Sequence, residues 1–125
     1  MITKNVVITI KDGRAKLSEK IILYRNDKGI DIYFTLNGFN YKFKKDGFTG
    51  AEVDGILMKP SKDVVVISSM KIAETNKIKF TIDSTMTDEL SEVGTHTLQI
   101  RLYYDSTKQH RVTLPPITFE VKEEL

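Results

Sequence analysis

Two histidines, His96 and His110, are the side chains of this chain whose ordinary pKa suits proton transfer near neutral pH. His96 falls on the apolar face of an alternating pattern, where a buried structural histidine is the better interpretation. His110 stands in a predicted polar loop beside Arg111. The sequence suggests no Ser-His-Asp set, and the G-x-S-x-G, H-E-x-x-H and phosphate-loop patterns are absent. We therefore predict that the protein is not an enzyme and has no catalytic residues.

Carboxylates and thiols are among the side chains that bind metal ions in proteins. The aspartates are scattered, and those that stand at predicted turns and strands are Asp27, Asp31, Asp54 and Asp83. A calcium site needs several oxygen ligands close together, so turn and strand-edge roles are favoured for them. The chain has no cysteine, which excludes disulfides and thiolate metal sites. We predict no metal and no cofactor.

A basic run and one loop aromatic indicate contacts with other macromolecules. Lys42, Lys44 and Lys45 stand close together. They form either a solvated strand face that prevents edge-to-edge aggregation or a docking surface for an acidic partner. Phe48 lies in the glycine-flanked segment KDGFTG, where its ring could contact a neighbour. These four residues are candidate interaction residues.

Tyr103 and Tyr104 are consecutive in a predicted strand, so their side chains lie on opposite faces. At least one of them is therefore expected to face solvent. An exposed tyrosine suits a protein interface or a sugar-binding platform, because its ring is apolar and its hydroxyl is polar. We add Tyr103 to the candidate interaction residues.

Composition places the chain in a broad class. It has 125 residues, 19 basic and 17 acidic, with a formal net charge of +2. A nucleic-acid-binding domain usually has a dense basic patch, and nearly equal numbers of basic and acidic residues do not indicate one. The first residues contain no long apolar run, so we expect neither a signal peptide nor a membrane span. We predict one domain over residues 1–125, made in a cytoplasm, where it could also be assembled into a particle.

Alternating apolar residues predict short strands throughout the chain. The predicted strands are 6–10, 20–24, 30–36, 39–43, 51–58, 64–68, 78–82, 96–104 and 117–121. Asp12-Gly13 predicts a turn, and Asn37-Gly38 predicts a tight hairpin between the third and fourth strands. Gly55 is a candidate bulge within its strand. One helical piece, 87–93, is expected to be capped by Thr87 or Ser84 and ended by Gly94.

No predicted helix is long enough to connect parallel strands. Turn signals that recur every 8–12 residues are typical of a β-sandwich. The fold class is therefore predicted as all-β: an antiparallel immunoglobulin-like β-sandwich of about eight or nine strands with at most one short helical turn.

A series of short motifs runs through most of the chain in a particular order. They are Tyr24–Phe34, Ile56–Pro60, Val64–Ile67, Asn76–Phe80, Leu90–Gly94, Tyr104–Asp105 and Pro115–Val121. In this order they resemble the N-terminal domains of the baseplate upper protein (BppU) family of tailed phages and prophages of Gram-positive bacteria. The series, more than any single motif, carries the resemblance. The chain departs from the family pattern at His96, where an aromatic residue is usual, and at Leu114–Pro116, in place of a Ser/Thr-rich segment.

The resemblance implies a structural adaptor in the tail baseplate of a virion, made in the host bacterial cytoplasm. It implies docking of the host-attachment apparatus to the tail tip, with the distal tail core and a receptor-binding protein as partners. It also implies a homo-oligomer, a trimer by analogy, and neither nucleic acid nor membrane as partner. The alternative is a carbohydrate-binding module that contacts host cell-wall sugars, although the chain has no tryptophan. A bacterial surface domain is a further alternative, against which the lack of a signal peptide counts.

Overall fold

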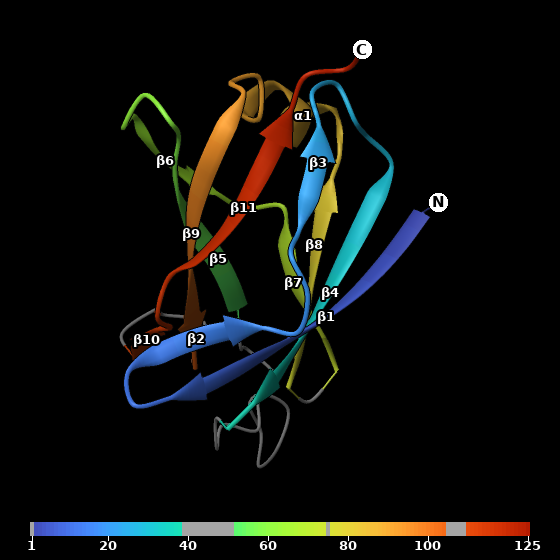
Figure 1. Cartoon of the computed structure of the whole chain (residues 1–125). Coiled ribbons are helices and arrows are strands. Elements are labelled where there is room, and N and C mark those ends of the chain that lie inside the picture. Colours follow the sequence, from blue (N-terminus) through green and yellow to red (C-terminus); the bar gives the residue numbers. More distant parts are fainter. Residues whose placement is uncertain (1, 39–51, 75, 105–109) are drawn as a thin grey trace.

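In the computed structural model, residues 2–38, 52–74, 76–104 and 110–125 are described, and they form two layered β-sheets (Figure 1). Sheet A contains, in order across the sheet, β2 (Arg14–Leu17), β1 (Ile2–Lys11), β4 (Ile30–Asn37), β8 (Lys77–Ile82) and β7 (Met70–Glu74). Sheet B contains β3 (Ile22–Tyr24), β11 (Ile117–Lys122), β9 (Gly94–Tyr103), β5 (Glu52–Met58) and β6 (Val64–Ile67), with β10 (Arg111–Thr113) also paired to β9. The predicted all-β sandwich is confirmed.

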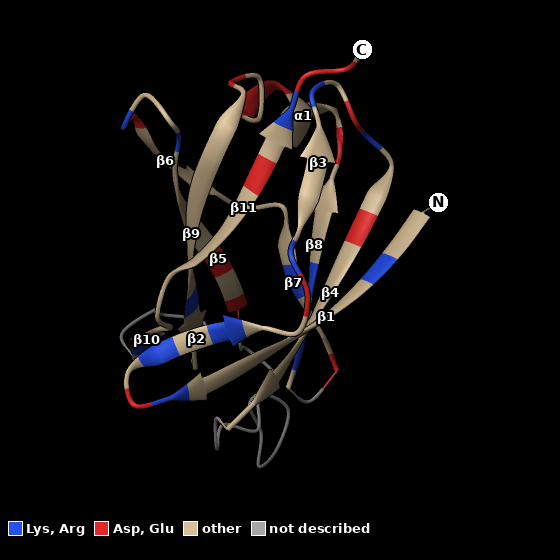
Figure 2. Cartoon of the chain, in the orientation of Figure 1, with Lys and Arg blue, Asp and Glu red and all other residues tan. Residues whose placement is uncertain are grey.

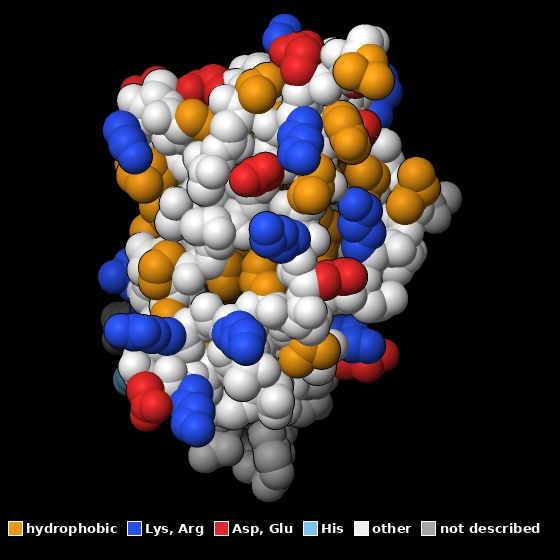
Figure 3. Space-filling view, in the orientation of Figure 1, with side chains coloured by type: hydrophobic (Ala, Val, Ile, Leu, Met, Phe, Trp, Pro, Cys, Tyr) orange, Lys and Arg blue, Asp and Glu red, His pale blue; other side chains and the backbone are white. Residues whose placement is uncertain are grey.

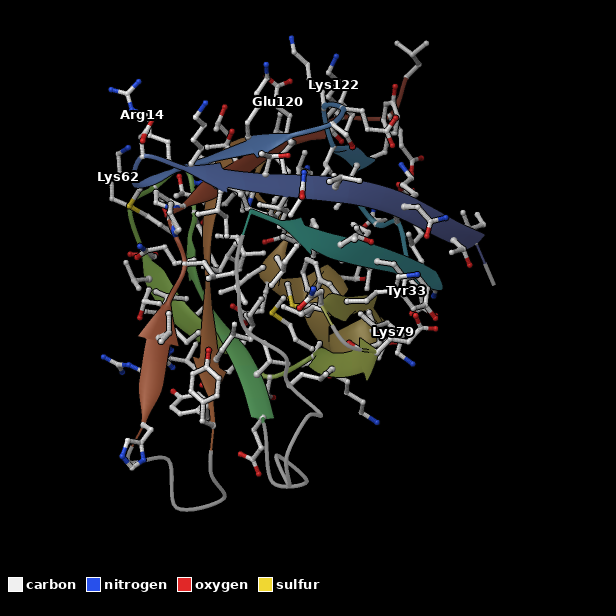
Figure 4. The ribbon with its side chains drawn as sticks, turned by 90° about the horizontal axis from the view of Figure 1, so that it is seen from below. Arg14, Tyr33, Lys62, Lys79, Glu120 and Lys122 are labelled. Carbon is white, nitrogen blue, oxygen red and sulfur yellow. The ribbon has the colours of Figure 1, made fainter. Side chains whose placement is uncertain are left out.

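The period-two alternation of the sequence decides which side chains form the core. In β9, Leu98, Ile100 and Leu102 are buried, whereas the intervening residues face outward. In sheet A the core contains Phe34 and Phe80, whose ring centroids lie 6.4 Å apart. The residues between the buried ones point away from the interior. Figure 4 shows this for Glu120 and Lys122 of β11.

Both sheets are mixed, so the expectation of purely antiparallel pairing is wrong. β1 runs parallel to β4, from Ile2 opposite Ile30 to Thr9 opposite Asn37. β3 runs parallel to β11. A parallel pair needs a long crossover, usually a helix. Here the chain between β1 and β4 crosses by way of β2 and then β3, which belongs to the other sheet. The described residues contain eleven strands, more than the eight or nine predicted.

The turn at Asp12–Gly13 is confirmed, and the hairpin expected at Asn37–Gly38 is not found. Asp12 and Gly13 have φ values of 53° and 73°, as a two-residue hairpin between β1 and β2 requires. β4 is paired with β1 along one edge and with β8 along the other, over Ile30–Thr35. No edge remains there for a hairpin partner. The predicted return strand, 39–43, lies outside the described residues.

Gly55 is required for packing and does not form a bulge. The pairing of β5 with β9 is continuous through it, with Gly55 opposite Ile100. A Cβ at this position would lie 2.9 Å from Leu98 Cδ1 and 3.1 Å from Ile67 Cγ1. The glycine therefore allows neighbouring core side chains to approach the backbone of β5 closely.

The helix α1 (Ser84–Glu89) begins three residues earlier than predicted. Its N-cap is Asp83, whose carboxylate accepts a hydrogen bond of 2.9 Å from the backbone N–H of Met86. Neither predicted cap, Ser84 or Thr87, is the N-cap, because both lie within the helix. Leu90 is the C-cap, and Gly94 opens β9 with a φ of 133°.

Candidate interaction surfaces

Only one of the five candidate interaction residues lies in the described part of the chain. Lys42, Lys44, Lys45 and Phe48 fall within 39–51, outside the described residues, and their role stays a prediction. Tyr103 is the last residue of β9. It lies opposite Glu52 of β5 on one side and Arg111 of β10 on the other.

Tyr103 is held in a polar cluster with Asp54 and Arg101 on the outer face of sheet B. Its hydroxyl donates a hydrogen bond of 3.2 Å to Asp54 Oδ2. The guanidinium carbon of Arg101 lies 5.9 Å from the centroid of the Tyr103 ring. Tyr103 is only 7% exposed, so the structure does not present it as a solvent-facing tyrosine. Its side chain contacts Asp54 of β5 and Arg101 of β9, which strand alternation alone could not reveal.

The ion pair between Asp54 and Arg101 joins β5 to β9. Arg101 Nε donates to Asp54 Oδ1 at 2.7 Å, and Nη2 donates to Oδ2 at 2.8 Å. The two side chains are 14% and 15% exposed, and their hydrogen bond raises the pKa of Arg101. Such a two-point pairing is geometrically specific. Both oxygens of Asp54 accept hydrogen bonds, so this carboxylate serves to position strands and is poorly suited to act as a base.

His96 is fully buried in the core. Its position on the apolar face of the strand predicted this burial. It is 0% exposed, and its ring stacks on Phe119 at a centroid distance of 5.3 Å and an angle of 6°. Its Nδ1 lies 3.3 Å from the carbonyl oxygen of Gly94, and Nε2 has no hydrogen-bond partner within the described structure. Burial lowers the pKa of His96, which favours the neutral ring. This histidine cannot reach a substrate in solvent.

The four aspartates considered as metal ligands have structural hydrogen bonds instead. Asp27 accepts from the backbone N–H of Tyr24 at 3.0 Å, and Asp31 accepts from the Thr81 hydroxyl at 2.8 Å. Asp54 and Asp83 bind Arg101 and cap α1, as described above. Within the described ranges, no three His, Cys, Asp or Glu residues are grouped to hold a metal ion.

No helix in the described part of the chain has the length and apolarity to span a membrane.

A groove of about 650 Å³ lies between β2 and β11, at the open side of the sandwich. Its apolar wall includes Leu17, Ile117 and Phe119, and Lys16 and Lys20 also line it. Figure 3 shows apolar side chains in this hollow with charged side chains around it. Sequence patterns do not indicate this groove, because it forms only where β2 of sheet A lies near β11 of sheet B.

Comparison with known proteins identifies the fold. No family model matches the chain, and no curated protein matches it in sequence. Among solved structures, it is similar to the N-terminal domain of phage TP901-1 ORF48, with a TM-score of 0.64 and 12% sequence identity. The match covers 98% of this chain and 99% of that one. That protein is a baseplate upper protein, so the resemblance seen in the sequence is confirmed at the level of fold.

Proposed function

We propose that this chain is a structural adaptor domain of a phage or prophage tail baseplate, where it docks the host-attachment apparatus to the tail tip. The observation that carries the proposal is the end-to-end fold match, over 98% of this chain and 99% of a phage domain. The series of sequence motifs supports the same assignment independently. Because fold alone does not determine function, the surfaces must also suit this role.

The described side chains suit a rigid docking module without catalysis. The core histidine, His96, is inaccessible, and Asp54 has both oxygens engaged. The pairing of Asp54 with Arg101 ties adjacent strands together on an outer face of the sandwich. A module of this kind keeps its shape while loops and strand edges contact neighbouring proteins.

The partners follow from the proposed place in the particle. They are the distal tail core and a receptor-binding protein, with further copies of this chain in a homo-oligomer, a trimer by analogy with the family. We place the domain in the virion baseplate, after synthesis in the host bacterial cytoplasm, in contact with neither nucleic acid nor membrane. Phe48, Lys42, Lys44 and Lys45 remain the proposed contact residues, whereas Tyr103, which is buried, is no longer proposed as one.

The sugar-binding alternative is less well supported. Recognition of a sugar ring uses an exposed aromatic face, and Tyr103 is 7% exposed with Arg101 near its ring. A carbohydrate array probed with the purified chain distinguishes the two functions. We expect no specific signal, whereas dose-dependent binding to cell-wall sugars would favour the alternative.

Two experiments test the adaptor function. Gold-labelled antibodies against the chain should decorate the tail tip of intact particles in electron micrographs. Co-expression with the distal-tail and receptor-binding proteins encoded nearby should give a complex that co-elutes in size-exclusion chromatography. Particles that lack the chain, together with no complex with either protein, would refute the proposal.

The predicted contact residues allow a sharper version of the co-elution test. A K42E/K44E/K45E variant and a Phe48→Ala variant should each weaken the complex. Lys71→Glu is the matched control, because Lys71 is exposed on β7 and is not a proposed contact. If Lys71→Glu weakens the complex as much as the triple variant does, the net charge of the chain, and not the surface formed by Lys42, Lys44 and Lys45, determines docking.

A further inference from the structure

The groove between β2 and β11 is bounded on one side by an unpaired strand edge. β2 is the outermost strand of sheet A, and its inner edge is hydrogen-bonded to β1. The N–H of Ser18 donates to the carbonyl oxygen of Val7 at 2.9 Å, which sets the alternation of this ladder. Lys16 therefore bonds to β1, whereas Ala15 and Leu17 direct their N–H and C=O groups away from it. Both Ala15 and Leu17 line the groove.

The opposite side of the groove is a second strand edge. The N–H of Glu120, in β11, donates to the carbonyl oxygen of Ile21 at 3.0 Å, so Glu120 directs its backbone groups toward β3. Thr118, two residues earlier, directs its N–H and C=O the same way. The pairing of β3 with β11 begins only at Ile22, opposite Glu120, so no strand of the described structure lies beside Thr118. Thr118 lines the groove instead.

The side chains between these two edges are apolar. Leu17 of β2 is half-buried, and Ile117 and Phe119 of β11 are buried. An extended chain laid along β2 would direct every second side chain toward them, because side chains alternate between the faces of a strand. The groove therefore suits a segment with apolar residues at alternate positions.

Positive charge lies along the outer face of β2. Arg14 and Lys16 are exposed there, and both are blue in Figure 2. Figure 4 shows Arg14 pointing away from the sandwich. Arg14 lies directly opposite Lys11 of β1, and like charges in such a pair repel each other. None of the ion pairs among the described residues includes Lys11, Arg14 or Lys16. Acidic groups beside β2 would relieve this repulsion.

Carboxylates also occur around the groove, but cations outnumber them. Two shallower hollows adjoin the groove and share Lys16 or Lys20 with it. The charged residues that line the three concavities are Lys4, Lys11, Arg14, Lys16 and Lys20 against Asp12, Glu19 and Glu120. Complementary charge guides association, so this excess favours an acidic occupant.

We propose that the groove binds an extended segment of a second baseplate protein, in which acidic side chains alternate with apolar ones. The segment pairs with the free edge of β2 and adds a strand to sheet A. Its apolar side chains contact Leu17 and Ile117. Its acidic side chains lie beside Arg14 and Lys16, where opposite charges stabilise cross-strand pairs. The assignment of the segment to a baseplate protein rests on the proposed function.

A synthetic peptide of alternating glutamate and valine tests the groove directly. It is titrated into the 125-residue chain and followed by NMR. We expect saturable shifts at the amides of Ala15, Leu17 and Thr118, with a dissociation constant below about 1 mM. Peptides of alternating lysine and valine and of alternating glutamate and serine are the matched controls. Each should bind at least about tenfold more weakly, because the first reverses the charge and the second removes the apolar face.

Absence of saturation, equal binding of either control peptide, or shifts centred on another strand edge would overturn the proposal.

Variants of β2 test the two parts of the contact separately. Arg14→Glu combined with Lys16→Glu should weaken peptide binding at least about tenfold by reversing the charge. Ala15→Pro should do the same by removing an outward N–H that β1 does not use. Lys71→Glu, at the opposite edge of sheet A, is the matched control and should leave binding unchanged. Circular dichroism establishes that each variant folds. Binding that survives both changes in β2 would overturn the proposal.

Co-elution separates this proposal from the adaptor function. In the co-expression test described above, the Arg14→Glu, Lys16→Glu chain should form the complex at least about tenfold more weakly, whereas Lys71→Glu should not. A complex that forms equally well with the double variant would overturn the groove as a docking site and leave the adaptor function intact. Absence of any complex with the unaltered chain would count against the adaptor function, and the peptide titration would still decide whether the groove binds an acidic strand.

Discussion

At the scale of single residues, the ion pair between Asp54 and Arg101 is more buried than the pair between Arg25 and Glu123. Arg25 and Glu123 also lie 3.0 Å apart, but their side chains are 43% and 60% exposed. Solvent screens that exposed pair, and such pairs contribute about 0–1 kcal/mol. Asp54 and Arg101 are 14% and 15% exposed, so loss of one partner leaves the other poorly solvated.

We predict that Asp54→Asn lowers the free energy of unfolding by about 1–3 kcal/mol, because it removes the charge that Arg101 needs. Urea unfolding monitored by circular dichroism measures this. Glu123→Gln is the control and should change stability by less than about 1 kcal/mol. Equal effects of the two changes would mean that burial does not distinguish the pairs.

His96 makes stability depend on pH. Burial lowers its pKa in the folded protein below the ordinary value of 6.5, so the unfolded chain binds this proton first as the pH falls. The contribution of His96 is complete above pH 6.5 and is lost as the pH falls toward the lower folded pKa. The slope cannot exceed about 1.4 kcal/mol per pH unit for one proton.

We predict that His96→Phe removes this slope and keeps the stacking on Phe119, because phenylalanine does not titrate. Unfolding free energies measured from pH 7.5 down to about pH 5 give the result. This pH range lies above the ordinary pKa values of carboxylates, which are about 4, so most carboxylates do not titrate within it. A slope that is unchanged in the variant would assign the titration to another group.

At the scale of secondary structure, β5 depends on a residue without a side chain. Gly55→Ala should lower the free energy of unfolding by about 1–3 kcal/mol, because the new Cβ overlaps Leu98 at 2.9 Å. Thermal and urea unfolding measure the loss. The same change in a Leu98→Ala background should cost less, since the truncated side chain leaves room. If Gly55→Ala lowers the free energy of unfolding equally with and without Leu98→Ala, the loss comes from the backbone conformation of residue 55 and not from the contact with Leu98.

At the scale of the whole molecule, the segment between β1 and β4 connects the two sheets. It supplies β2 to sheet A and β3 to sheet B. The ammonium group of Lys4, in β1, donates to the carbonyl oxygen of Ile22 at 3.2 Å. This contact links the first strand of one sheet to an edge strand of the other.

We predict that Lys4→Met loosens β3 without unfolding the sandwich. Hydrogen exchange should accelerate at the Glu120 amide, which bonds to the Ile21 carbonyl at 3.0 Å. The Thr81 amide, which bonds to the Ser69 carbonyl in sheet A, is the internal control and should be unaffected. Faster exchange at both amides would show global destabilisation.

The sequence by itself determined most of the strands, though not β2, β7 and β10, together with the turn at Asp12–Gly13 and the buried position of His96. Each depends on neighbours within a few residues, because side chains alternate between faces and only certain residues accept a positive φ. The resemblance also came from the sequence, since it rests on the order of local motifs.

Only the tertiary structure decided that β1 and β4 are parallel, that Tyr103 is covered and that β2 and β11 form a groove. Each of these features depends on which strands lie side by side, and those strands are far apart in the chain. Local periodicity says that a strand has an apolar face. It does not say which strand pairs with it, because pairing is decided by the packing of all strands around one core.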